Sequence, residues 1–248
     1  MSASASDASV RERQIADTLL AMRGAGMDWG QIYQSGDQPW SKKIANGFLL
    51  CSLLDYQIPS PKAWANGDRL VNDILGDPDD VWFAIASVSE GEWKSRHSEY
   101  KLHRFPVAHL RLWRTGKRVC DTYQGDARRI WQGKEPSAAL EALWNVGAGD
   151  QIARMIVGAL KDCGQIRNAA SDVKGDVYVR RVLGRAVLGR PTDAETAVAI
   201  ARRLHPADPW QLDSALWVIG SSYCKTIPAC SECKLAVQCT YALGNLAS

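Results

Sequence analysis

The chain has 248 residues, of which 46% are hydrophobic, so it can form one large domain or two small ones around a sizeable core. Its net charge of +3 permits a nucleic-acid partner without requiring one. No apolar run approaches the roughly 18 residues of a membrane span, and the start of the chain lacks the pattern of a secretory signal. Seven cysteines, four of them clustered, fit a reducing compartment. We therefore expect a cytoplasmic protein with no membrane partner.

The apolar residues recur with helical spacing along nearly the whole chain, and no convincing alternating strand is present. The sequence therefore predicts an all-α fold. Residues 1–9 are typical of a frayed tail, and a first amphipathic helix is expected over 9–23. A turn-rich linker over 27–42 precedes a second helix over 44–56.

Residues 62–135 are predicted to form several shorter helices. Within them, the stretch Lys94–Arg118 is strongly basic, with His97, His103 and His109 interleaved. Such a stretch is either the solvated face of two helices or a surface that contacts phosphates, and both interpretations stay open. The histidines are expected to be surface or packed residues rather than metal ligands, because no carboxylate or cysteine shares their spacing.

A pair of glycines separates two helices further along. Pro136 begins a helix that runs to Trp144, and Val146-Gly147-Ala148-Gly149 precedes a second apolar-faced helix. Paired glycines can expose backbone N–H groups at the start of a helix, where the helix dipole also favours a phosphate. An ordinary tight turn would have the same sequence pattern.

The next helix is predicted over 176–188 and begins with an acid, Asp176. Asp176 is either a plain N-cap or a carboxylate that is free for chemistry, and the two roles are compatible. Thr192 and Glu195 predict a capping box for the helix that follows. Asp208 and Pro209 are expected to cap and start the helix that leads into the clustered cysteines.

Four thiols fall within sixteen residues at the spacing C-x5-C-x2-C-x5-C: Cys224, Cys230, Cys233 and Cys239. Thiolates are ligands for zinc or for an iron–sulfur cluster. Structural zinc sites usually use two close pairs of ligands, whereas this stretch has one C-x-x-C flanked by two single cysteines. The spacing therefore favours a [4Fe–4S] cluster over zinc.

These motifs together resemble the iron–sulfur helix-hairpin-helix DNA glycosylases, the endonuclease III and MutY-like enzymes. The cysteine stretch resembles that family's cluster loop, although its first gap is five residues where the family usually has six. Leu143–Gly149 resembles the L-P-G-V-G hairpin without its proline. Asp176–Arg185 resembles the segment that carries the family's essential aspartate, and Leu53–Gln57 resembles L-L-S-A-Q.

The resemblance implies a two-lobed fold. A six-helix barrel lobe with the hairpin would cover 42–163, and a second lobe with the [4Fe–4S] cluster loop would combine 1–41 with 164–248. It also implies that Asp176 is catalytic and that Gln151 stands where glycosylase/lyases carry a lysine. Because an amide cannot form a Schiff base, a monofunctional enzyme is expected, with Lys174 as the substitute amine if lyase activity exists. Asp172 is a second candidate for the carboxylate.

Further roles follow from the same resemblance. Gln57 would fill the space left by an extruded base. The residues expected to bind DNA are Gln57, Val146, Gly147, Ala148, Gly149, Arg180 and Arg181. The residues expected at the base pocket are Tyr56, Asp55 and Tyr178. Arg185, Arg202 and Arg203 would add positive charge on the cluster side.

The resemblance therefore implies a base-excision DNA glycosylase that acts as a monomer on double-stranded DNA, in the nucleoid of the cytoplasm. Two alternatives stay open: a bifunctional glycosylase/lyase that uses Lys174, and a non-catalytic iron–sulfur protein that binds DNA or senses redox state. The base that would be excised does not follow from the sequence. MutY-type enzymes carry a glutamate where this chain has Ser52, so excision of adenine by that route is not expected.

Overall fold

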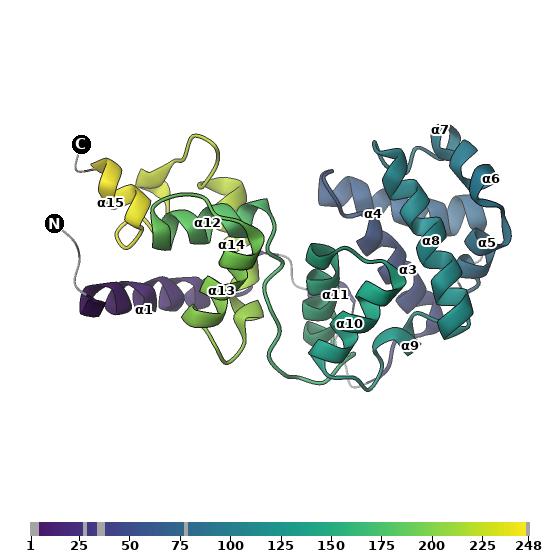
Figure 1. Ribbon diagram of the computed structural model, residues 1–248, viewed down its shortest axis with the longest axis horizontal. Helices are drawn as coiled ribbons and strands as arrows, with labels where there is room; N and C mark the ends of the chain where they lie inside the picture. The colour runs from purple at the N-terminus through teal and green to yellow at the C-terminus, as the bar shows by residue number, and fades with distance from the viewer. Residues whose placement is uncertain (1–4, 27–28, 34–37, 77–78, 247–248) are drawn as a thin grey trace. The chain divides into compact units, whose positions relative to one another are not determined.

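The computed structural model describes residues 5–26, 29–33, 38–76 and 79–246, and this part of the chain contains helices and no strands (Figure 1). The predicted all-α fold is confirmed. The chain divides into two compact units. The central unit is Ser35–Asn168, and the terminal unit combines Met1–Gln34 with Ala169–Ser248. None of the described helices has both the length and the apolar character needed to cross a bilayer.

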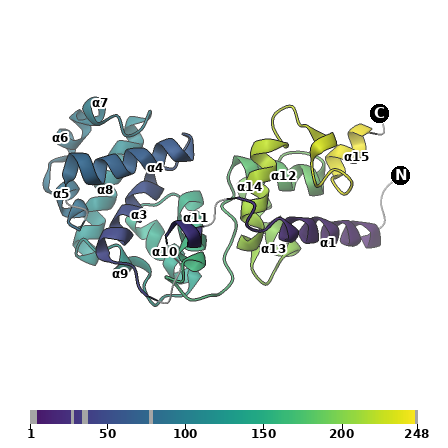
Figure 2. The same ribbon diagram turned by 180° about the vertical axis from the view of Figure 1, so that it is seen from behind.

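The central unit is built around α3, whose residues are buried along most of its length. In both views α4 lies beside α3 (Figures 1 and 2). Three fully buried tryptophans, Trp82, Trp93 and Trp131, fill the core together with Phe48. The elements are α3 (Lys42–Leu54), α4 (Ser60–Arg69), the π-helical turn η1 (Leu70–Leu75), α5 (Val81–Ser87), α6 (Glu90–Ser95), α7 (His97–Tyr100), α8 (Pro106–Tyr123), α9 (Arg128–Trp131), α10 (Pro136–Val146) and α11 (Asp150–Asp162).

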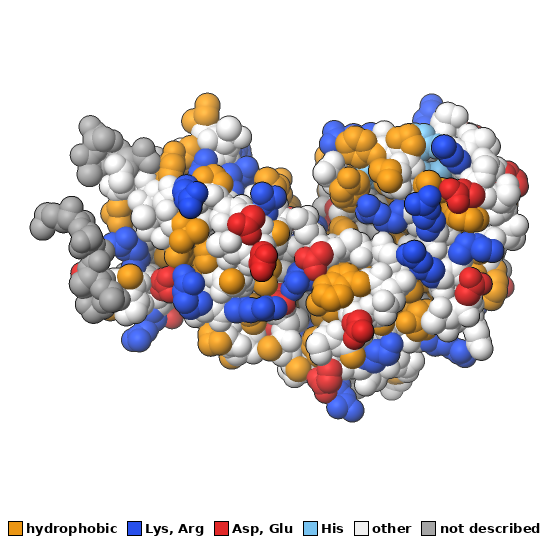
Figure 3. Space-filling view, in the orientation of Figure 1, with side chains coloured by type: hydrophobic (Ala, Val, Ile, Leu, Met, Phe, Trp, Pro, Cys, Tyr) orange, Lys and Arg blue, Asp and Glu red, His pale blue; other side chains and the backbone are white. Residues whose placement is uncertain are grey.

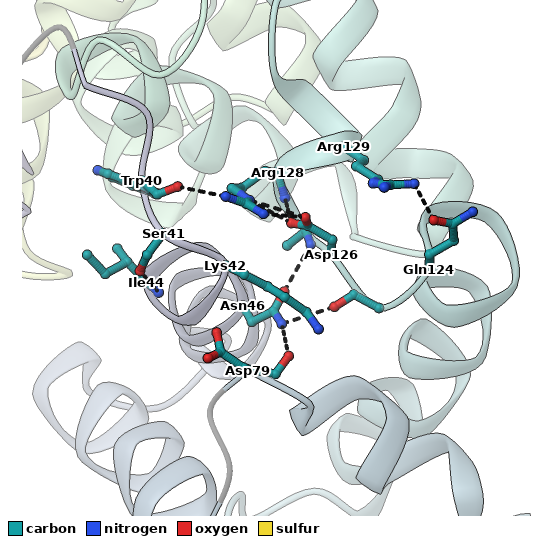
Figure 4. Close-up of polar contacts among 12 residues, drawn as sticks. Trp40, Ser41, Lys42, Ile44, Asn46, Asp79, Gln124, Asp126, Arg128 and Arg129 are labelled. Carbon is teal, nitrogen blue, oxygen red and sulfur yellow. Dashed lines mark hydrogen bonds and ion pairs between the residues drawn. The ribbon is translucent and has the colours of Figure 1, made fainter.

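One buried amide ties three parts of the central unit together (Figure 4). Asn46 of α3 is fully buried, and its Nδ2 donates to the carbonyls of Asp79 at 2.9 Å and Gly125 at 3.0 Å. Its Oδ1 accepts from Trp82 Nε1 at 3.1 Å and from the Ala127 amide at 2.9 Å. Both donors and both acceptor positions of the side chain are therefore satisfied.

Replacing Asn46 with leucine is expected to lower the free energy of unfolding by about 3 kcal/mol or more, because three buried groups and the partly buried carbonyl of Asp79 lose their partner together. Urea denaturation of the purified chain measures this change. Asn72→Leu is the matched control: the Asn72 side chain is exposed and, of the residues that the structure describes, bonds to the Asp68 carbonyl alone, so a change below about 0.5 kcal/mol is expected. Equal denaturation midpoints for the two variants would contradict the role given to Asn46.

The terminal unit packs the first helix of the chain against the last quarter of it. Ile15 and Leu19 of α1 are fully buried in one apolar cluster with residues of α12, α13 and α14. A two-bond ion pair, Arg203 to Glu12 at 2.7 and 2.8 Å, joins α13 to α1. The elements are α1 (Ala5–Ala21), α2 (Trp29–Ile32), α12 (Val177–Leu188), α13 (Ala194–Leu204), the 3₁₀ turn η2 (Pro209–Leu212), α14 (Asp213–Ser222), the 3₁₀ turn η3 (Cys230–Glu232) and α15 (Thr240–Leu246).

Three local predictions need correction. Helix α1 begins at Ala5, inside the segment predicted as a tail, whose first four residues lie outside the described part. The predicted linker over 27–42 contains the short helix α2, and its residues 27–28 and 34–37 are likewise not described. The predicted capping box of Thr192 and Glu195 is wrong. Asp193 caps α13 instead, because its carboxylate accepts from both the amide and the hydroxyl of Thr196, each at 2.8 Å.

Candidate functional site

Asp176 is the N-cap of α12. Its backbone is extended, and its Oδ1 accepts from the amides of Tyr178 at 2.8 Å and Val179 at 3.1 Å. Its side chain is half-buried, and no donor among the described residues bonds to Oδ2. One carboxylate oxygen therefore satisfies the helix terminus, and the other is available to a ligand.

The backbone leading into Asp176 is held in place. The Lys174 amide donates to Asp213 Oδ1 at 2.7 Å, which ties this segment to the start of α14. Gly175 follows with φ of +65°, a left-handed conformation that favours glycine. Lys174, the candidate amine, is half-exposed two residues before the candidate carboxylate.

The second candidate carboxylate, Asp172, is committed to an ion pair. Arg202 binds both of its oxygens at 2.7 Å, and the Asp172 side chain is only 15% exposed. The hydrogen bond and charge of Asp172 raise the pKa of Arg202 above its usual value. A carboxylate held in this way has both oxygens occupied, so Asp176 is the better placed acid.

The first turn of α12 packs closely against α14. A Cβ on Gly220 would lie 2.5 Å from the Tyr178 Cβ, so only glycine lets the two backbones approach this far. The Arg181 guanidinium donates to the Gly220 carbonyl at 2.9 Å and lies 5.6 Å from the Tyr178 ring centroid. Arg180 donates to the Thr192 carbonyl at 3.0 Å. Both arginines predicted to bind DNA therefore also hold the terminal unit together.

In the central unit, the chain turns sharply after α3. Gln57 is exposed and adopts φ of +52°, a left-handed conformation that is uncommon for a residue with a side chain. Asp55, predicted near the base pocket, is buried and accepts from the Ser60 hydroxyl at 2.8 Å. Of these two, Gln57 is the one whose side chain is open to a ligand.

Tyr56 belongs to an aromatic stack that the sequence did not predict. Its ring lies 5.6 Å from that of His103 with an interplanar angle of 15°, and the His103 Nε2 lies 2.6 Å from the Tyr56 carbonyl oxygen. The Arg111 guanidinium lies 5.2 Å from the Tyr56 ring centroid. Burial lowers the pKa of His103, and the charges of Arg104 and Arg111 lower it further. Only the basic run Lys94–Arg118 hinted at this cluster.

The paired glycines form a turn between α10 and α11. Gly147 ends α10 with φ of +98°, and the Ala148 amide donates to the Leu143 carbonyl at 3.0 Å. Gly149 is exposed and extended at the N-cap of α11. Val146 and Ala148 are buried, so these two residues can offer a ligand only their backbone.

The first turn of α11 does not supply the amine that a glycosylase/lyase would use as its nucleophile. Gln151 is half-exposed at the position predicted for the lysine. The preceding residue, Asp150, is exposed and receives Arg154 Nε at 3.1 and 3.0 Å. No lysine side chain belongs to this turn, which spans residues 150–153.

The four clustered cysteines line one pocket of the terminal unit. None forms a disulfide, and apolar side chains from α12, α14, α15 and the loop before α15 also line the pocket, among them Val182, Ala186, Ile219, Leu235 and Ala242. Burial raises the pKa of Cys233 and Cys239, and neighbouring thiolates raise both further. Four thiolates in an apolar pocket therefore need a cationic centre to be stable there.

Arg185 lies beside this pocket and requires a correction. It was predicted to add charge to the surface, but its side chain is buried. Its guanidinium donates to the Lys225 carbonyl at 2.6 Å, to the Thr226 carbonyl at 3.2 Å and to the Cys224 sulfur at 3.4 Å. Arg185 therefore holds in place the loop segment that follows the first cysteine.

Among the described residues, no group of three or more His, Cys, Asp or Glu side chains is close enough to hold one metal ion. The four thiols nevertheless share a pocket. Such an arrangement has the donor type and number of a polynuclear cluster, whose separate irons each bind one cysteine.

Comparison with protein-family models and with curated proteins gives no match for this sequence. Solved structures do match its fold. One of them is a non-covalent complex of endonuclease III with DNA, with a TM-score of 0.63 and 17% sequence identity. The match covers 96% of this chain and 99% of that chain.

Proposed function

We propose that this chain, which has the helix-hairpin-helix fold of endonuclease III, is a DNA glycosylase. It would hydrolyse the N-glycosidic bond of a damaged, mismatched or modified base that is flipped out of duplex DNA. The observation that carries this proposal is Asp176, which caps α12 with one oxygen while the other receives no bond from the described part of the chain. The endonuclease III neighbour was solved with DNA, which supports a DNA substrate.

The chemistry assigned to Asp176 follows from the reaction. As the bond from C1′ to the base nitrogen breaks, its electron pair leaves with the base and the sugar becomes oxocarbenium-like. A nearby carboxylate stabilises this positive charge. Water then forms the new bond to C1′, and the carboxylate accepts the proton that the water loses.

Water is the proposed nucleophile because the first turn of α11 supplies no amine. Gln151 has an amide that cannot form a Schiff base. The resulting enzyme would be monofunctional and leave an abasic site. Lys174 precedes Asp176 by two residues and is the amine of the alternative, a bifunctional glycosylase/lyase.

Access to the base requires extrusion from the stack, which costs a few kcal/mol or less at a mismatched or damaged position. We assign the exposed Gln57 to the vacated space, where its amide would bond the orphaned partner base. Its left-handed backbone presents the side chain beyond the end of α3. The hairpin around Gly147 and Gly149 would bind a backbone phosphate.

We assign a [4Fe–4S] cluster to Cys224, Cys230, Cys233 and Cys239, whose four thiols line one pocket of the terminal unit. The cluster would supply no step of base release; its role would be to hold the loop that carries Lys225 and Lys234 in a shape that contacts DNA. Arg185 supports the same loop through its two backbone carbonyl bonds.

A screen of duplexes that each contain one modified base tests this function. The expected result is release of at least one base by the wild-type chain, followed by strand nicking only after alkali. Nicking without alkali, together with a borohydride-trapped covalent complex, would assign lyase activity and favour Lys174. No release from any duplex, with DNA binding retained, would favour the non-catalytic DNA-binding protein.

A further inference from the structure

The basic stretch Lys94–Arg118 forms most of α8, and Lys and Arg side chains gather over this helix on the face seen in Figure 3. Two arginines of α8 already have partners: Arg114 pairs with Glu90 at 3.4 Å, and Arg111 lies over the Tyr56 ring. Arg118 is exposed and, within the described residues, has no hydrogen-bond or ion-pair partner. Its charge is therefore available to an external ligand.

Arg118 reaches the glycine turn. A Cβ added to Gly147 would lie 2.5 Å from Arg118 Nη1 and 3.7 Å from Arg118 Cζ. The guanidinium therefore occupies the space that any larger residue at 147 would fill. This contact joins the end of α8 to the turn between α10 and α11, two places far apart in the sequence.

A buried hydroxyl faces the same point. Thr115, one turn before Arg118, is fully buried, and its Oγ1 has no hydrogen-bond partner among the described residues. This oxygen lies 3.6 Å from the Cβ position built on Gly147, and Arg118 Nη1 lies 2.5 Å from the same position. An unpartnered buried hydroxyl is unfavourable, so a role in a bound state is a physical reason for its presence.

The turn itself lacks a cation. Its residues Val146–Gly149 carry no charge, and Asp150 places a negative charge in the first turn of α11. Arg154 offsets that charge through its ion pair with Asp150. The α11 N-terminus favours an anion through its dipole, but a phosphate that approaches Asp150 needs a further positive group.

We propose that Arg118 is that group: it binds a phosphodiester of the DNA backbone at the glycine turn, and Thr115 positions its guanidinium. The inference rests on the proposed function for the identity of the anion. The planar guanidinium would donate two parallel bonds to the phosphate oxygens. The Thr115 hydroxyl would accept from the guanidinium and thereby gain the partner it lacks.

Binding of a fluorescent, unmodified duplex across a salt series tests the site, because this measurement does not depend on the excised base. Arg118→Ala in the full chain is expected to weaken duplex binding about three- to ten-fold. It should also reduce the steepness of the plot of log association constant against log salt concentration by about 1. Arg118→Lys keeps the charge, so it should retain the slope and recover part of the affinity. Arg114→Ala, on the same helix but paired with Glu90, should change both values little.

Thr115 has a separate signature. Thr115→Val keeps the shape of the side chain, so it should leave the melting temperature unchanged or higher while weakening DNA binding about two- to five-fold with the salt slope intact. Thr115→Ser should restore binding. Unchanged affinity in Thr115→Val would remove Thr115 from the site.

Arg118→Ala that binds like wild type, or an equal loss in Arg114→Ala, would overturn the assignment of Arg118. In either case base release by the wild-type chain would leave the proposed function standing. Conversely, the wild-type chain could release no base while Arg118→Ala alone lowers the duplex affinity and the salt slope. That result would support the phosphate site and contradict the glycosylase proposal. A folded wild-type chain that binds no duplex would overturn both.

Discussion

Asp176→Asn is expected to lower the rate of base release by about 10²–10⁴-fold, the range usually lost with a general base, while fold and DNA binding are retained. Asparagine is as good an N-cap as aspartate, so its amide oxygen can still accept from the Tyr178 and Val179 amides. The substitution removes only the negative charge. Single-turnover release from a responsive duplex, measured beside thermal melting and duplex affinity, tests this expectation.

Two companion variants separate the cap from the chemistry. Asp176→Ala removes both, so it should additionally destabilise the terminal unit by about 1 kcal/mol. Asp193→Asn changes the N-cap of the neighbouring helix α13 in the same way and should leave base release unaltered. Full activity in Asp176→Asn would limit this carboxylate to its capping role and leave the reaction without its proposed general base.

Cys233→Ser is expected to remove the cluster. A serine hydroxyl is a poor ligand for iron in place of a thiolate, and the three half-buried thiols that remain in the pocket are one ligand short of the four that the cluster needs. Iron content should fall from about four atoms per chain to near zero, with loss of the brown colour. Elemental analysis and the visible spectrum of protein purified without oxygen measure both.

Cys120→Ser is the matched control for that experiment. Cys120 is a half-buried thiol on α8 that belongs to the central unit and does not line the pocket. Its replacement should leave iron content unchanged. A colourless wild-type chain that holds one zinc would overturn the cluster assignment and favour the other metal compatible with thiolate ligands.

The parts of this molecule that were predictable are those that depend on neighbours in sequence. Helical periodicity located the helix after Asp176, and the acid at its head is an N-cap as its position indicated. The same reasoning failed at α13, where Thr192 and Asp193 are both good caps and only the fold decides between them. Propensity alone cannot distinguish adjacent residues of similar capping strength.

The contacts that could not be predicted join segments far apart in the chain. Arg185 has the spacing of an ordinary helical arginine, yet it is buried against the backbone of Lys225 and Thr226. Likewise, nothing in the run Lys94–Arg118 distinguishes Arg118 from Arg114, although only Arg118 lies against Gly147. Such pairings depend on how the helices pack, which single-sequence patterns do not encode.

The two ends of helix α12 belong to two different candidate sites. Asp176 caps its first turn, and Arg185 in its last turn donates to the Cys224 sulfur. Twelve helical residues extend about 18 Å. If the proposed cluster occupies the cysteine pocket, its loss in an iron-poor cell would release the loop that Arg185 binds and loosen the C-terminal end of α12. The proposed base release would then decline with the iron supply, because the same helix positions Asp176 at its other end.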